Sequence, residues 1–107
     1  MDAPITAKAA LLQALVSGPG FGLDLIARVK ERTRGGLELG QGSVYPALRD
    51  MEREGFVRSW DGESLPERGG RPRRYYELTA AGRRVAVGNA EVVSDLFEMG
   101  LLIGGAR

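Results

Sequence analysis

The sequence predicts a mainly α-helical fold with one small β-hairpin. Three helix-like segments come first, and each ends at glycine. Two short segments with strand-like composition follow, separated by a loop rich in glycine and arginine, and a last helix-like segment comes after them. A chain of 107 residues with 43% hydrophobic residues can bury one modest core. We therefore expect a single domain over residues 1–79 and a separate C-terminal helix within residues 80–107.

The first two helices are predicted from apolar spacing. Apolar residues recur at helical spacing between Ile5 and Val16, and SGPG at residues 17–20 ends this run. The segment LDLIARVKERTR, residues 23–34, carries an apolar stripe and stops at the glycine pair 35–36. Basic residues fill the second half of this helix, where they suit the helix dipole and give a basic surface.

The third helix lies within QGSVYPALRDMEREG, residues 41–55. One side is apolar and consists of Val44, Ala47, Leu48 and Met51. The opposite side is open and consists of Gly42, Pro46, Arg49 and Arg53. Proline is tolerated only in the first turn, so the helix should start between residues 40 and 43, and the later end is favoured. Ser43 can then act as its cap, and the helix covers about residues 42–55.

The hairpin is predicted over the next segments. Residues 56–60 alternate like a strand, DGESLPERGGRP is loop-like, and residues 73–78 resume strand composition. Because neighbours on a strand face opposite sides, one of Tyr75 and Tyr76 should pack inward. Three helices followed by a two-stranded ribbon indicate a winged helix-turn-helix, whose third helix enters a DNA major groove while the wing, about residues 61–74, contacts the DNA beside it.

The charge distribution supports a polyanionic partner. Residues 68–84 carry six arginines and one glutamate, although the whole chain has a net charge of only +1. A basic wing tip would meet DNA phosphates, whereas the alternative is an arginine-rich loop in contact with solvent only.

Composition excludes several other classes. The chain has no cysteine and no histidine, which removes the common zinc sites and the Ser-His and Cys-His nucleophiles. We expect no enzyme activity, no metal and no cofactor. No segment is apolar enough to span a membrane, and a cytoplasmic location is expected.

Three motifs carry a family resemblance. FGLDLIARV, GSVYPALRDMEREGFV and GGRPRRYYELTAAGRR together resemble the PadR family of bacterial transcription regulators over about residues 5–84. The resemblance implies a dimeric winged-helix repressor that binds operator DNA. It places residues 43, 45, 46 and 49 on the recognition helix and residues 70–75 on the wing. The candidate DNA-binding residues are Gln41, Ser43, Tyr45, Arg49, Arg71, Arg73 and Arg74.

Each candidate has a structural alternative. Gln41 and Ser43 could read base edges or cap the helix. The Tyr45 ring could pack against the wing, and Arg49 and Arg53 could pair with acidic residues of their own helix. Trp60 is expected to pack on the strands.

The C-terminal segment is expected to form the dimer. Thr79 is a good N-cap for a helix from Ala80 to about residue 100 or 104. Family members commonly dimerise through such helices, and the candidate interface residues are Leu12, Val92, Leu96, Phe97 and Leu101. The alternative is that this helix folds back on its own core.

The function predicted is therefore sequence-specific binding of double-stranded DNA by a homodimer on a pseudo-palindromic operator, with repression as the outcome. Relief of repression would require an effector, such as a small molecule, that changes the spacing or tilt of the two wings. The alternative is a winged-helix module that binds a protein instead of DNA.

Overall fold

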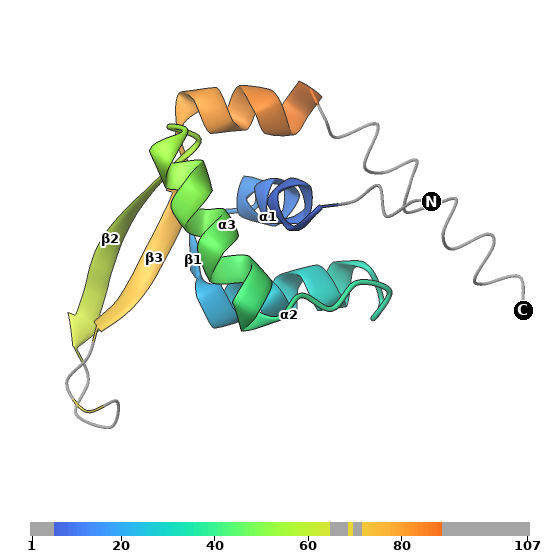
Figure 1. The fold of residues 1–107 in the computed structure, drawn as a ribbon, viewed down its shortest axis with the longest axis horizontal. Coiled ribbons are helices and arrows are strands. Elements are labelled where there is room, and N and C mark those ends of the chain that lie inside the picture. Colours follow the sequence, from blue (N-terminus) through green and yellow to red (C-terminus); the bar gives the residue numbers. More distant parts are fainter. Residues whose placement is uncertain (1–5, 65–68, 70–71, 89–107) are drawn as a thin grey trace, which may run out of the picture.

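The computed structural model of the chain describes residues 6–64, 69 and 72–88, which form four helices and three strands (Figure 1). The elements, in chain order, are α1 (Ala7–Val16), β1 (Gly20–Phe21), α2 (Gly22–Arg32), α3 (Gln41–Arg53), β2 (Val57–Ser64), β3 (Pro72–Leu78) and a helix over residues 80–88. The helices gather on one side, and the hairpin of β2 and β3 extends away from them (Figure 1). This arrangement confirms the predicted winged helix-turn-helix.

Helix α1 forms the centre of the core. Thr6 caps it, because its hydroxyl accepts a hydrogen bond from the Ala9 amide at 3.1 Å. Leu11 and Leu15 are 0% and 1% exposed, and the buried residues spread around more than one face of the helix. A helix that is apolar on several sides must be covered on several sides. Figure 1 shows α1 between α2 and the helix over residues 80–88.

The connection from α1 to α2 is held by Arg28. Its guanidinium donates to the carbonyl oxygens of Ala14, Gly18 and Pro19 at 2.9, 2.8 and 2.7 Å. It also pairs with Asp24 at 2.7 Å. Arg28 therefore satisfies carbonyls at the end of α1 and does not contribute to the basic surface that the sequence predicted on α2.

Helix α3 starts within the predicted range of residues 40–43, but not at the later end that the sequence favoured. The amides of residues 43 and 44 both donate to the Gly40 carbonyl at 3.0 Å, so the helix begins at Gln41 and Gly40 is its N-cap. No side chain caps this end, and the prediction that Ser43 does so is wrong. Pro46 is the sixth helical residue, where it removes one helical hydrogen bond to Gly42. Both residues are exposed, so water can solvate the freed carbonyl.

The sheet has three antiparallel strands in the order β1-β3-β2. Strand β1 pairs Gly20 with Tyr76 and Phe21 with Tyr75. This strand could not be predicted, because two residues are too few for a periodic pattern. The β2 and β3 ladder runs from Val57 opposite Leu78 to residue 61 opposite residue 74 and resumes at residue 64 opposite residue 72, with an irregularity between. That irregularity matches a β-bulge, which increases local twist.

The base of the hairpin is joined to the last described helix. The Thr79 hydroxyl accepts from the Gly82 amide at 3.0 Å and donates to the Gly55 carbonyl at 2.6 Å, which confirms Thr79 as the N-cap. A Cβ at Gly82 would lie 1.9 Å from the Phe56 carbonyl oxygen, so only glycine allows this approach. Gln13 on α1 donates to the Ala86 carbonyl at 2.8 Å. Residues 80–88 therefore pack against the core, and the predicted continuation to about residue 100 lies outside the described residues.

Candidate nucleic-acid interface

The two sides of α3 differ as predicted. Val44, Ala47, Leu48 and Met51 are buried. The opposite side is exposed and consists of Gln41, Gly42, Ser43, Pro46, Arg49 and Arg53. The side chains of Gln41, Ser43 and Arg49 therefore offer an amide, a hydroxyl and a guanidinium to solvent, which are groups that read base edges and phosphates.

Tyr45 lies at the edge of these two sides and is half-buried. Its ring occupies the space that a side chain at Gly22 would need: a Cβ there would lie 2.4 Å from the ring Cε1 and 2.5 Å from Oη. Gly22 is the first residue of α2. The Tyr45 ring therefore joins α3 to the start of α2.

Arg73 lies on the face of the sheet that points away from the core, called here the outer face and formed by Phe21, Trp60, Arg73 and Tyr75. The Arg73 guanidinium sits 4.5 Å from the centre of the Phe21 ring. Its Nε is buried and makes no hydrogen bond in the described part of the chain. Cation and ring attract each other in this geometry. Arg73 on β3 therefore packs against the Phe21 ring on the neighbouring strand β1.

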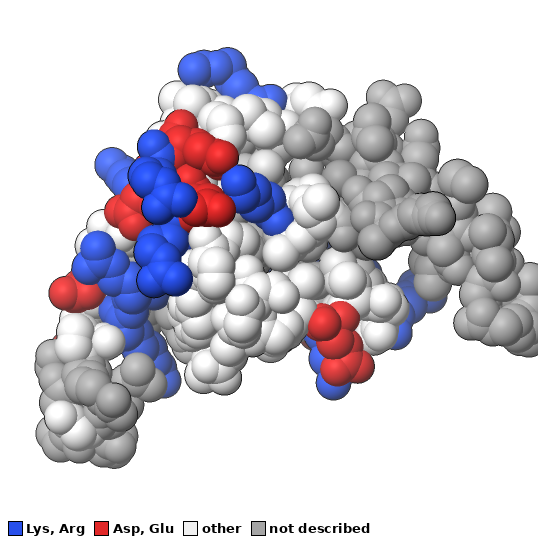
Figure 2. All heavy atoms as spheres, in the orientation of Figure 1, with Lys and Arg blue, Asp and Glu red and all other residues white. Residues whose placement is uncertain are grey.

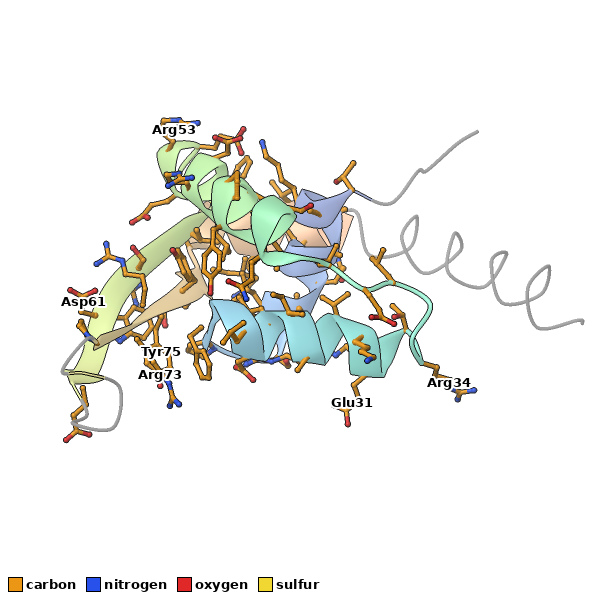
Figure 3. All side chains as sticks on the ribbon, turned by 60° about the horizontal axis from the view of Figure 1, so that its bottom comes forward. Glu31, Arg34, Arg53, Asp61, Arg73 and Tyr75 are labelled. Carbon is orange, nitrogen blue, oxygen red and sulfur yellow. The ribbon has the colours of Figure 1, made fainter. Side chains whose placement is uncertain are left out.

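Tyr75 joins all three strands on the same outer face. Its ring centre is 5.6 Å from that of Phe21, edge to face, and 5.9 Å from that of Trp60, nearly parallel. Figure 3 shows Tyr75 and Arg73 on one side of the hairpin, with Asp61 away from them. Trp60 is 39% exposed and packs on Tyr75, as predicted for a residue that stabilises the strands.

Arg74 lies on the other side of the hairpin, called here the α3-side face and formed by Ser59, Asp61, Arg74 and Tyr76. Its Nη1 donates to the Asp61 carboxylate at 2.8 Å, and its Nε donates to the Ser59 hydroxyl at 3.1 Å. Ser59 in turn donates to Glu52 of α3 at 2.7 Å. The Asp61 hydrogen bond raises the pKa of the Arg74 guanidinium above its ordinary value. This network connects α3 to both strands of the hairpin.

Tyr76 is the inward tyrosine of the predicted pair. It is 9% exposed, and burial raises the pKa of its phenol, with a smaller contribution from the Glu52 charge. Its hydroxyl therefore stays protonated at neutral pH.

Basic and acidic side chains alternate near the end of α3. Figure 2 shows lysine and arginine side chains gathered along the hairpin and this end of α3, with acidic side chains among them. Arg53 pairs with Asp50, and Lys8 pairs with Glu54 at 2.9 Å. Arg53 therefore pairs with an acidic residue of its own helix, which was the structural alternative to DNA binding. Arg49 makes no ion pair with any residue the structure describes.

The remaining candidates fall into two groups. Arg71 and the predicted dimer residues Val92, Leu96, Phe97 and Leu101 lie outside the described residues. Leu12 is described and is only 5% exposed, as part of the core around α1. Within the described residues, no group of acidic side chains could hold a metal ion, and no helix has the length and hydropathy of a membrane span.

Sequence reasoning missed two partners of the wing arginines. Phe21 lies in the short strand β1, and Asp61 lies in a segment that reads as loop. The alternation of β3 could have separated Arg73 from Arg74, but their partners depend on pairing between strands.

Comparisons with known proteins agree with this geometry. The model of the transcriptional regulator PadR-like family matches residues 11–87. A transcriptional regulator from Clostridium thermocellum superposes with a TM-score of 0.70 at 19% identity, over 87% of this chain and 84% of that one. A PadR family transcription regulator from Clostridium difficile gives 0.66 at 22% identity, over 91% and 96%.

A structure of a DNA complex is also similar. Bacillus subtilis PadR in complex with operator DNA superposes with a TM-score of 0.63 at 25% identity, over 76% of this chain and 44% of that one. A search of curated proteins found no match.

Proposed function

Because the chain belongs to the PadR-like family of transcriptional regulators, we propose that it is a sequence-specific DNA-binding repressor that acts as a homodimer. In this proposal α3 is the recognition helix and enters a major groove. The hairpin is the wing and contacts the DNA alongside.

One observation carries the proposal: the exposed side of α3 and the α3-side face of the hairpin are joined through Glu52, Ser59 and Arg74. This hydrogen-bonded unit of α3 and the hairpin is called here the α3–wing frame. It carries the base-reading groups of Gln41 and Ser43 and the cations of Arg49 and Arg74. Such a frame can present base contacts and phosphate contacts in one register. The operator complex of Bacillus subtilis PadR supports DNA as the partner.

A two-fold dimer would place two such frames in successive major grooves, about one helical turn apart, on a pseudo-palindromic operator. We expect the segment beyond residue 88, with Val92, Leu96, Phe97 and Leu101, to form the interface. A dimer bound to promoter DNA would block access of RNA polymerase, which is repression. We expect the protein to act in the cytoplasm. An effector, such as a small molecule, would relieve repression by changing the spacing of the two wings.

The test is fluorescence anisotropy with a labelled duplex from upstream of the gene, against a shuffled duplex, at about 0.15 M salt. Specific binding exceeds non-specific binding by about 10³ or more in typical regulators. We expect Arg49→Ala, and the combined change of Arg71, Arg73 and Arg74 to Ala, to weaken binding to the native duplex.

Arg34→Asn is the matched control. Arg34 also carries an exposed positive charge, but it lies beyond the end of α2, far from the hairpin (Figure 3). Its backbone is left-handed, with φ of 53°, a conformation that asparagine tolerates. Equal weak binding to both duplexes by all variants would contradict the proposal and favour a protein-binding winged helix.

A further inference from the structure

Asp61 is an acidic residue on the surface that the proposed function assigns to DNA. Its carboxylate accepts a hydrogen bond from Arg74 at 2.8 Å, and its side chain is 58% exposed while that of Arg74 is 49% exposed. An anionic oxygen at this position occupies one of the guanidinium donors that would otherwise bind a phosphate.

We propose that Asp61 is an internal substitute for a DNA phosphate: it holds Arg74 in the free protein, gives it up to the DNA backbone in the complex, and thereby lowers affinity for DNA of any sequence. The proposal rests on the proposed function.

The geometry favours exchange over permanent pairing. An exposed ion pair is weak, because water and salt screen it, so a phosphate in the strong field of duplex DNA can replace the carboxylate. The Ser59 hydroxyl, 3.1 Å from the Arg74 Nε, is fixed by Glu52 and can keep the guanidinium in place when Asp61 leaves. The Arg74 Nη2 makes no hydrogen bond to any residue in the described part of the chain, so it offers a first contact to a phosphate.

Arg73 provides an internal contrast. Its guanidinium lies over the Phe21 ring on the outer face, and no carboxylate of the described residues pairs with it. Of these two neighbouring arginines, only Arg74 pairs with a carboxylate among the described residues, whereas Arg58 on the outer face pairs with Glu77, away from α3. This is the pattern expected if Asp61 acts on a DNA contact.

The experiment measures affinity for a labelled duplex of unrelated sequence, about two helical turns long. We expect Asp61→Asn to bind this duplex about two- to fivefold more tightly than the wild type at about 0.15 M salt. Asparagine keeps an acceptor oxygen but not the charge, and Asp61→Ser provides a second variant. Thermal unfolding checks that each variant folds.

Two controls separate local exchange from a general charge effect. Glu63→Gln removes the same charge two residues away on an exposed position of β2. Arg74→Ala removes the cation that Asp61 holds. We expect Asp61→Asn to raise the affinity for the unrelated duplex more than Glu63→Gln does in the wild-type background. In the Arg74→Ala background, the two substitutions should raise the affinity equally.

The outcomes are distinct. If Asp61→Asn and Glu63→Gln change the duplex affinity equally in both backgrounds, the effect comes only from net charge and the inference is wrong. If Asp61→Asn weakens binding, Asp61 orients Arg74 for DNA, which also overturns the inference while leaving DNA binding intact. If the wild type binds no duplex even at low salt, the proposed function fails and the inference fails with it.

Discussion

Arg73 and Arg74 are neighbours in sequence but belong to two different surfaces. On the outer face, Arg73 contacts the Phe21 ring and Tyr75 joins three strands through aromatic contacts. On the α3-side face, Arg74 is held by Asp61 and by a serine that contacts α3. The outer-face side chains pack on one another, whereas the α3-side face is joined to α3 by polar contacts. Charge counted along a segment therefore does not give the charge available at one surface.

The largest expected effect comes from removing the central ring of the outer face. Tyr75→Ala deletes both aromatic contacts and leaves Phe21 and Trp60 without their shared neighbour. We expect a loss of about 2–3 kcal/mol in the free energy of unfolding, because large-to-small changes and lost aromatic pairs add. Urea unfolding measures it.

Tyr75→Phe is the control for this change, because it keeps the ring and removes only the hydroxyl. It should change stability by less than about 0.5 kcal/mol. A Tyr75→Ala variant as stable as Tyr75→Phe would show that the outer face does not stabilise the hairpin.

The next effect concerns the space beside this ring. A Cβ at Gly62 would lie 2.5 Å from the Tyr75 Cε1 and 3.3 Å from the Arg73 carbonyl oxygen, so Gly62→Ala forces the ring to move. We expect a loss of about 1–2 kcal/mol, typical of overpacking. Gly42→Ala is the control, since nothing lies within 4 Å of its Cβ position on α3, and it should be neutral or stabilising by up to about 1 kcal/mol. Equal stability of the two variants would contradict the packed outer face.

A third experiment separates the two arginines directly. Arg73→Ala should lower the free energy of unfolding by about 0.5–1 kcal/mol through the lost contact with Phe21. Arg74→Ala should leave unfolding nearly unchanged but reduce the salt dependence of DNA binding, log Kd against log salt, by about one phosphate contact. Anisotropy titrations at several salt concentrations measure the second effect. If both variants changed the salt dependence equally, the two faces would not differ in function.

The helices and the hairpin could be predicted because their signals are local. Apolar spacing and terminal glycines identify α1 and α2, and the alternation of β3 predicts one inward tyrosine. The sequence predicted the start of α3 only to within residues 40–43, because Gly40 is its N-cap and leaves no side-chain signal. Pro46 suggested a later start, yet its exposed position lets water replace the lost helical bond.

The site could be predicted only in part for a related reason. The sequence indicates which side of α3 is open, but it does not indicate which tyrosine is buried or which arginine is paired. Those depend on register: Val57 opposite Leu78 sets Tyr76 toward the core and brings Asp61 opposite Arg74. Strand pairing joins residues distant in sequence, so a segment such as DGES, residues 61–64, reads as loop although it forms the end of β2.

The smallest expected effect distinguishes the inward tyrosine by its ionisation. Burial raises the pKa of Tyr76 in the folded protein above its ordinary value of about 10. Above about pH 10, Tyr76 loses its phenol proton in the unfolded chain but keeps it in the folded chain, so the free energy of unfolding falls as pH rises. Tyr76→Phe removes this titration and should lose less stability than the wild type between about pH 9 and 11. Urea unfolding at each pH measures the difference, and parallel losses in the two proteins would mean that Tyr76 ionises alike in the folded and unfolded states.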